Sequence, residues 1–167
     1  MKKICFCLLF FICLLFSSCA SVPNMQSLLA YQNENATLQL QIHDGEIFSA
    51  HLVLEEGTFL LTFQDDTRKE ISYRQNADES IRILYREKEI PIENSELLKC
   101  KEWFSLFRLS AEKHLWKIKK EKLGGTQVFV CKSEGLTLYI DAVSKIPLKW
   151  KTDTIEIDVL HFERNAK

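Results

Sequence analysis

Apolar and polar residues alternate along most of the chain with a period of two positions. Leu38, Leu40 and Ile42 are separated by polar residues, as in a strand that buries one face. Asp44-Gly45 follows them, and this dipeptide is a strong signal for a tight hairpin turn. The same pattern predicts strands over 38–42, 48–54, 59–63, 69–73, 80–85, 88–92, 114–118, 126–133, 136–141, 146–151 and 154–162.

Short polar turns separate these segments, so neighbours in sequence are expected to pair as an antiparallel meander. We therefore expect a mainly β (α+β) fold with a curved antiparallel sheet of about 10–11 strands. Pro91 has no N–H to donate, which places its segment at a sheet edge or a strand end. The charged run Lys119–Lys122 is interpreted as a solvated turn completed by Leu123-Gly124-Gly125, with a weak contact to anionic headgroups as the alternative.

Two segments have helical periodicity. Met25–Gln32 has a weak apolar face and follows Pro23, a residue suited to a helix start. Segment 94–108 can be capped by Asn94 or Ser95. Its apolar positions are Leu97, Leu98, Cys100, Trp103, Phe104, Leu106 and Phe107. That is too much apolar surface for a helix exposed to water, so we expect it to cover the concave face of the sheet. A helix lying on a membrane is the alternative, although its polar face is short and mixed in charge.

The start of the chain has the organisation of a secretory signal. Two lysines precede an uncharged apolar run from Ile4 to Phe16, and Ser17-Ser18 lead into Cys19. The run has thirteen residues, whereas a helix needs about 20 apolar residues to cross the hydrocarbon core of a membrane. An enduring membrane span is therefore not expected.

Ser17-Ser18-Cys19 resembles the lipobox of bacterial lipoproteins, with Phe16 where that motif usually has Leu. The resemblance implies a diacylglyceryl thioether on Cys19, cleavage before it, and acylation of the new amino group. Two or more acyl chains give stable anchoring. We expect a signal peptide over 1–18, a tether over 19–24, and one domain over 25–167, lipid-anchored in the bacterial envelope at the outer membrane facing the periplasm. An ordinary cleaved signal and an uncleaved anchor are the alternatives.

Composition gives little support to nucleic-acid binding or catalysis. Without residues 1–18 the chain has 20 basic and 23 acidic residues, a net charge of −3, and lacks the basic excess of nucleic-acid-binding domains. The four histidines have no metal-ligand spacing. No glycine-rich loop leads from a strand into a helix. We therefore expect no enzyme activity, no metal and no cofactor.

Cys100 and Cys131 are the cysteines outside the signal and its lipidation site. In an oxidising envelope these two could form a disulfide. Two buried thiols are the alternative, because cysteine is among the most buried residue types.

A family resemblance lies near the C-terminus. An alternating strand over 135–140 ends at Asp141, a tight turn contains Ser144-Lys145, and Ile146-Pro147-Leu148-Lys149 opens the next strand. This pattern resembles the strand–turn–strand of the outer-membrane lipoprotein carrier and receptor proteins (LolA/LolB-like) and of related mycobacterial lipoproteins, and 155–162 resembles their closing strand. The lipid-anchored receptor type is the nearer one, because of Cys19.

The resemblance implies a half-open barrel whose helix covers the mouth, with acyl chains held between the two. The apolar residues expected to line such a lipid-binding cavity are Phe48, Leu52, Phe59, Leu61, Phe63, Trp103, Phe104, Phe107, Trp116 and Trp150. The same residues suit an ordinary filled core, which would indicate a structural or protein-interaction lipoprotein instead.

Overall fold

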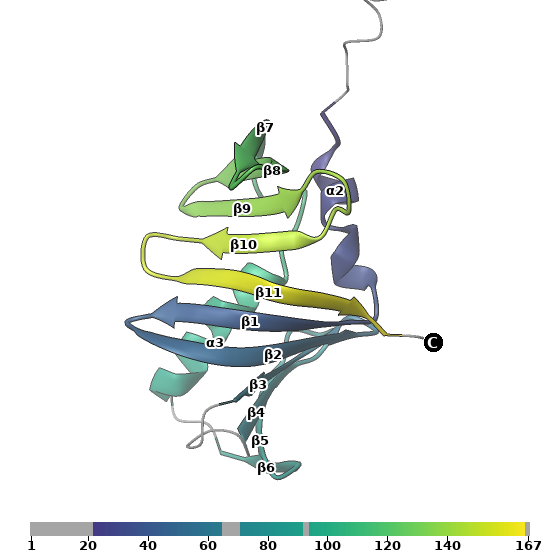
Figure 1. The fold of residues 1–167 in the computed structure, drawn as a ribbon. Helices are drawn as coiled ribbons and strands as arrows, with labels where there is room; N and C mark the ends of the chain where they lie inside the picture. The colour runs from purple at the N-terminus through teal and green to yellow at the C-terminus, as the bar shows by residue number, and fades with distance from the viewer. Residues whose placement is uncertain (1–21, 65–70, 92–93, 166–167) are drawn as a thin grey trace, which may run out of the picture.

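A computed structural model describes residues 22–64, 71–91 and 94–165 of the chain. Its described strands form one open antiparallel sheet in the order β6-β5-β4-β3-β2-β1-β11-β10-β9-β8-β7 (Figure 1). The strands are β1 (Ala36–Asp44), β2 (Glu46–Glu55), β3 (Thr58–Phe63), β4 (Ile71–Gln75), β5 (Ile81–Tyr85), β6 (Lys88–Ile90), β7 (Lys117–Leu123), β8 (Thr126–Ser133), β9 (Leu136–Asp141), β10 (Pro147–Lys151) and β11 (Glu156–Arg164). The predicted mainly β fold with an antiparallel sheet of 10–11 strands is confirmed.

The sheet consists of two meanders that meet in its middle. Strands β1 to β6 form one meander and β7 to β11 form the other, and β1 pairs with β11 along its length. A bulge between Gln39 and Leu40 shifts the register of this central pair. The pattern of alternating residues predicted the hairpins but not this long-range pair.

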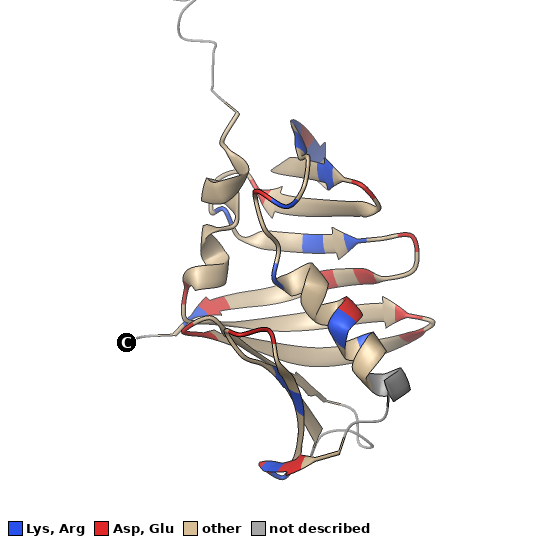
Figure 2. Cartoon of the chain, turned by 180° about the vertical axis from the view of Figure 1, so that it is seen from behind, with Lys and Arg blue, Asp and Glu red and all other residues tan. Residues whose placement is uncertain are grey.

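Helix α3 (Asn94–Phe107) connects β6 to β7, the two opposite edges of the sheet. A chain that joins one edge of a sheet to the other has to cross one of the two faces. Figures 1 and 2 show α3 lying across the sheet on the side toward which β3 to β6 bend. The topology therefore places an aromatic-rich helix over one sheet face.

The face of the sheet toward α3 is apolar, as the alternating pattern predicted. In β1, Leu38, Leu40 and Ile42 are buried, whereas Gln39 between them is exposed. The hairpin from β1 to β2 turns at Gly45, whose φ of 71° is left-handed and suits a residue without a Cβ. We refer to the buried side as the inner face and to the opposite side as the outer face.

The expected N-terminal helix is shorter than predicted and continues as a different helix type. An α-helix, α2 (Met25–Leu28), is followed by a 3₁₀-helix, η1 (Ala30–Asn33). Asn24 caps α2, because its side-chain oxygen accepts a hydrogen bond of 2.8 Å from the backbone N–H of Ser27. Leu28, Leu29 and Tyr31 are buried, so this segment closes one end of the core.

Two predictions about β7 were wrong. The expected strand 114–118 begins only at Lys117, and the expected charged turn Lys119–Lys122 is part of the strand, which pairs with β8 from Lys117 to Leu123. The strand lies at the edge of the sheet, and Ile118 is its one partly buried residue, so the strand lacks the apolar alternation of a half-buried strand. The pairing with β8, and not a local pattern of apolar residues, makes this segment a strand.

Cys100 and Cys131 are both buried thiols in the structure. Of the two alternatives that the sequence left open for this pair, the structure has the thiols and not the bridge. Both side chains pack inside an apolar core, where they serve as small hydrophobic residues.

The signal segment, Cys19 and the start of the expected strand 69–73 lie outside the described residues. Among the residues that the structure describes, no helix is long and apolar enough to cross a membrane.

Candidate lipid-binding site

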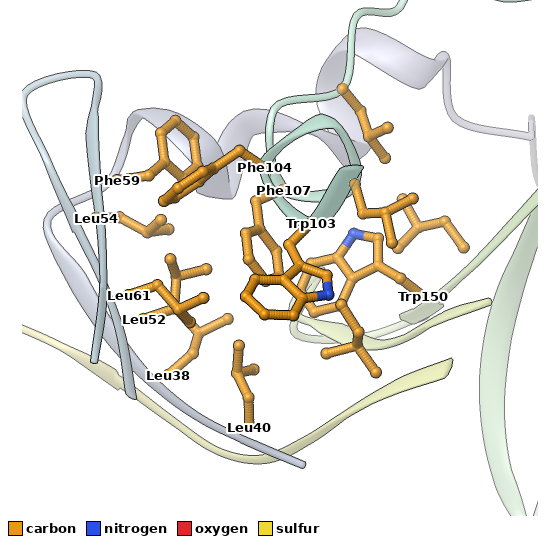
Figure 3. Close-up of a cluster of buried hydrophobic side chains, with 14 of the residues drawn as sticks. Leu38, Leu40, Leu52, Leu54, Phe59, Leu61, Trp103, Phe104, Phe107 and Trp150 are labelled. Carbon is orange, nitrogen blue, oxygen red and sulfur yellow. The ribbon is translucent and has the colours of Figure 1, made fainter. Parts of the chain in front are cut away.

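The ten residues expected to line a lipid site come from both sides of the interior. The sheet supplies Phe48, Leu52, Phe59, Leu61, Phe63 and Trp150, and α3 supplies Trp103, Phe104 and Phe107. Eight of the ten are buried, as Figure 3 shows for most of them. Phe48 and Trp116 are only partly buried. Trp116 lies in the connection between α3 and β7, and not in a strand as predicted.

Edge-to-face aromatic contacts join α3 to both halves of the sheet. The ring of Trp103 lies 5.4 Å from Phe63 and 6.2 Å from Tyr73, both in the N-terminal meander. The ring of Phe107 lies 5.6 Å from Trp150 in the C-terminal meander. Such pairs contribute about 0.5–1.5 kcal/mol each beyond the burial of their area. The helix therefore links the two meanders across the inner face.

Polar contacts between α3 and the sheet lie at the margins of the helix. The indole N–H of Trp103 donates a 3.1 Å hydrogen bond to Asp44 at the end of β1. Thr154, in the turn between β10 and β11, donates a 3.4 Å hydrogen bond to Glu102. Both contacts lie near the ends of strands and leave the middle of the interior apolar.

Arg108 makes the polar contacts at the C-terminal end of α3. Its guanidinium donates hydrogen bonds to the backbone carbonyls of Gly57 and Ala77, which lie in two different turns of the N-terminal meander. It also lies 4.9 Å from the ring centre of Phe59. Partial burial lowers the pKa of Arg108, but the group keeps its charge because an arginine pKa starts well above neutrality. Arg108 thus attaches the end of α3 to the sheet.

The thiol of Cys131 is a poor candidate for a nucleophile. Burial raises its pKa to about 11, so the thiol stays protonated at neutral pH. Within the described ranges, no group of three or more His, Cys, Asp or Glu side chains is arranged to hold a metal ion.

Four clefts in the described part of the chain are lined by residues of turns, strand ends, the N-terminal helical segment and the connection after α3. One of about 230 Å³ is bordered by Phe59 and Arg108, beside the C-terminal end of α3. The others are lined mainly by polar residues around Asn33 and Glu34, around Ser110 and Glu112, and around Lys151 and Asp153. None of these clefts is lined by Trp103, Phe104 or Phe107.

Comparison with known proteins supports the fold and does not assign a family. No family model matches the chain, and no curated protein matches it. A solved structure of an uncharacterized conserved protein from Thermus thermophilus is similar in fold, with a TM-score of 0.57 and 12% sequence identity, covering 87% of this chain and 90% of that one. At this identity the similarity concerns the fold alone. The resemblance to the LolA/LolB-like proteins stays a prediction.

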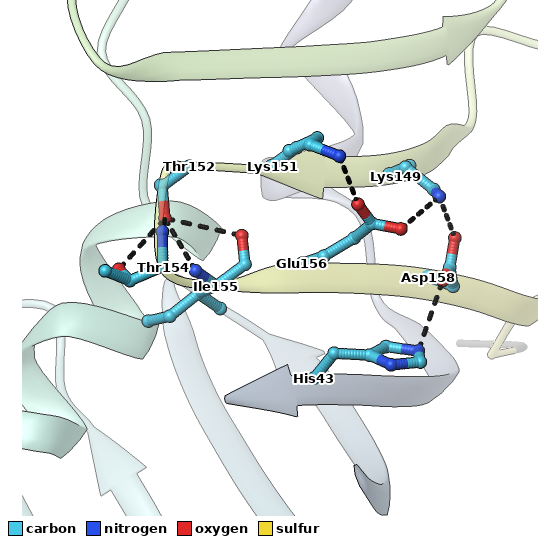
Figure 4. A network of polar contacts seen from close by, with 8 residues as sticks. All are labelled: His43, Lys149, Lys151, Thr152, Thr154, Ile155, Glu156 and Asp158. Atoms are coloured by element: carbon cyan, nitrogen blue, oxygen red, sulfur yellow. Dashed lines mark hydrogen bonds and ion pairs between the residues drawn. The ribbon is translucent and has the colours of Figure 1, made fainter. Parts of the chain in front are cut away.

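The outer face carries a polar network that the sequence analysis did not identify (Figure 4). Lys149 lies between Glu156 at 2.6 Å and Asp158 at 2.9 Å, and Lys151 lies 2.7 Å from Glu156. Hydrogen bonds from Lys149 and Lys151 lower the pKa of Glu156 to about 2. His43 lies 3.5 Å from Asp158.

Strand geometry explains where this network lies. Trp150 on β10 and Ile157 on β11 point into the core, so their sequence neighbours point to the outer face. The alternation alone was a usable signal for this placement. The partners, however, depend on the register between β10 and β11, in which Lys149 lies opposite Asp158 and Lys151 opposite Glu156. Tight pairing of each charge favours a role in holding the strands together.

Proposed function

We propose that this chain is a non-catalytic, membrane-anchored envelope lipoprotein that binds acyl chains of lipids or lipoproteins. The observation that supports the proposal most is the composition of the interior. An apolar inner face spans both meanders, and one aromatic-rich helix covers it through contacts that are almost all apolar. In this proposal the sheet acts as a half-open barrel and α3 as its movable cover.

An acyl chain can replace α3 at the inner face because both surfaces are apolar. Each buried methylene contributes about 0.8 kcal/mol. An acyl chain of ordinary length therefore regains much of the burial free energy that is lost when α3 leaves the inner face. Displacement has to break the hydrogen bond from Trp103 to Asp44, the one from Thr154 to Glu102 and those of Arg108. It separates no buried ion pair among the described residues. Net hydrogen bonds contribute only about 0.5–1.5 kcal/mol each. The polar contacts therefore add little to the cost of displacing α3, most of which lies in apolar contacts that an acyl chain can replace.

Anchoring follows from the same proposal. Cys19 carries the lipid, residues 19–24 form the tether, and the domain stands at the outer membrane facing the periplasm. A diacylated or triacylated cysteine satisfies the need for at least two chains in a stable anchor. The partners of the protein are then the membrane and the acyl chains of lipids or lipoproteins.

A second candidate is a structural or protein-interaction lipoprotein with a filled core. It is favoured by the complete burial of Phe104, Phe107 and Trp150, each at most 1% exposed. Such packing resembles an ordinary core, and the clefts around it lie elsewhere. The two candidates differ in whether α3 ever leaves the inner face.

Native mass spectrometry of the full chain purified gently from membranes tests the proposal. Bound lipid should appear as added mass that is lost on unfolding, in contrast to the covalent lipid on Cys19, which is retained. Uptake of a fluorescent fatty acid by delipidated protein gives an independent measurement. Absence of both, in protein that still carries its covalent lipid, would favour the filled-core candidate.

A further inference from the structure

The edge strand β7 carries a concentration of positive charge. Its exposed lysines are Lys117, Lys119, Lys120 and Lys122. Glu121 is the one acidic residue of the strand. Among the described residues, no ion pair involves any of these four lysines. Edge lysines oppose pairing between sheets of different molecules, but the residues around this strand indicate a more specific role.

Exposed apolar side chains flank the lysines. Leu115, just before β7, is 94% exposed, and Leu123 at its end is 44% exposed. Trp116 lies between Leu115 and the strand and is only partly buried. Lysines next to exposed leucines and an amphipathic tryptophan are typical of segments that lie at a membrane interface.

The geometry of an edge strand lets both of its faces reach one surface. Successive side chains point to opposite faces of a sheet, so Lys117 and Lys119 lie on one face and Lys120 and Lys122 on the other. If the sheet stands on its β7 edge, all four ammonium groups can reach the plane below. Lysines on the two faces of a strand in the middle of the sheet could not all reach one plane.

Strand β7 lies at the end of the molecule toward which the N-terminal part of the described chain runs. Figures 1 and 2 place β7 at the upper end, and the described segment before α2 runs toward the same end. Val22 is itself exposed. A membrane reached by this end of the chain would therefore meet β7, whereas β6 lies at the opposite end.

We propose that β7 and its flanking leucines bind anionic lipid headgroups and hold the domain with this edge toward the bilayer. The inference rests on the membrane anchoring in the proposed function. It deepens that function, because it leaves β6, at the opposite end of the sheet, facing away from the membrane.

Lysine labelling of the membrane-purified full chain in vesicles tests this orientation. The protein is reconstituted in phosphatidylcholine alone or in phosphatidylcholine mixed with phosphatidylglycerol, and the acetylation rate of each lysine is followed by mass spectrometry. Labelling of the β7 lysines should slow about fivefold in the anionic vesicles, the ratio that corresponds to roughly 1 kcal/mol per lysine near such a surface. Lys99 and Lys101 on the exposed side of α3 should keep their rates. High salt should abolish the difference.

Matched variants separate a specific surface from general attraction. The triple change Lys119→Gln, Lys120→Gln and Lys122→Gln should remove the protection of Lys117. The control triple Lys88→Gln, Lys99→Gln and Lys101→Gln removes the same charge from exposed sites elsewhere and should leave it intact. Equal labelling of β7 in both kinds of vesicle, or protection that survives the first triple, overturns the inference.

Flotation of the same samples reports on the anchor separately. Protein that does not float with phosphatidylcholine vesicles contradicts the lipid anchor, and protection by anionic vesicles would then still support the β7 surface. Protein that floats without protection of β7 overturns the surface and leaves the anchor standing.

Discussion

Replacement of Phe107 by alanine is expected to destabilise the fold strongly. Its side chain is 1% exposed and packs edge-to-face against Trp150 at 5.6 Å and Phe104 at 6.2 Å. Truncation of a buried phenylalanine usually costs about 3–5 kcal/mol, as lost transfer free energy plus the cavity that remains. The two aromatic pairs place this site toward the upper part of that range. A loss of this size is a large share of the stability of a domain, which is about 5–15 kcal/mol.

Urea unfolding of a soluble form that begins at residue 20 provides the assay, with circular dichroism and tryptophan fluorescence as two probes. Phe107→Leu should lose less, because it keeps much of the apolar volume. Lys101→Ala, on the exposed side of the same helix, should change the free energy of unfolding by less than about 0.5 kcal/mol.

A loss below about 1 kcal/mol for Phe107→Ala, with an unchanged denaturant slope, would refute the reasoning that α3 is packed into a filled interior. The same variants also bear on function when fatty-acid uptake is measured. If α3 is a movable cover, Phe107→Ala should increase uptake by the folded protein, because the closed state loses contacts that the open state lacks. Lys101→Ala should leave uptake unchanged.

The remaining predictions concern the anchor, the thiols and the outer-face network. Cys19→Ala should release the chain from the membrane fraction or leave an unprocessed precursor, and unchanged lipid labelling would contradict the lipoprotein proposal. Cys100 and Cys131 should react with a thiol reagent only after unfolding, without reductant, and a bridged form found in the native protein would contradict the structure. The pKa of Glu156 lies below its ordinary value of 4.5, at about 2, so its contribution to stability is present above pH 4.5 and is lost as the pH falls toward 2. Glu156→Gln should flatten the pH dependence of the unfolding free energy in that window, and an unchanged pH dependence would contradict its pairing with Lys149 and Lys151.

The local pattern of the sequence determined most of the strands and the main helix. Leu38, Leu40 and Ile42 alternate with polar residues, and burial in β1 follows that alternation. The predicted strands 126–133 and 136–141 have the bounds of β8 and β9, and the predicted helix 94–108 differs from α3 by one residue. These elements could be predicted because the period of apolar residues is a property of neighbours in sequence.

Tertiary structure decided which elements meet. The pairing of β1 with β11, with its bulge after Gln39, joins residues more than a hundred positions apart, and no local period encodes such a pair. It also decided that Lys119–Lys122 belongs to a strand, because only the hydrogen bonds to β8 make that segment extended. The local pattern could not choose between a cavity and a filled core, since Phe63, Trp103 and Trp150 have the same apolar character in either case. Only the path of α3 between opposite edges of the sheet brings Trp103 against Phe63 and Phe107 against Trp150 across the inner face.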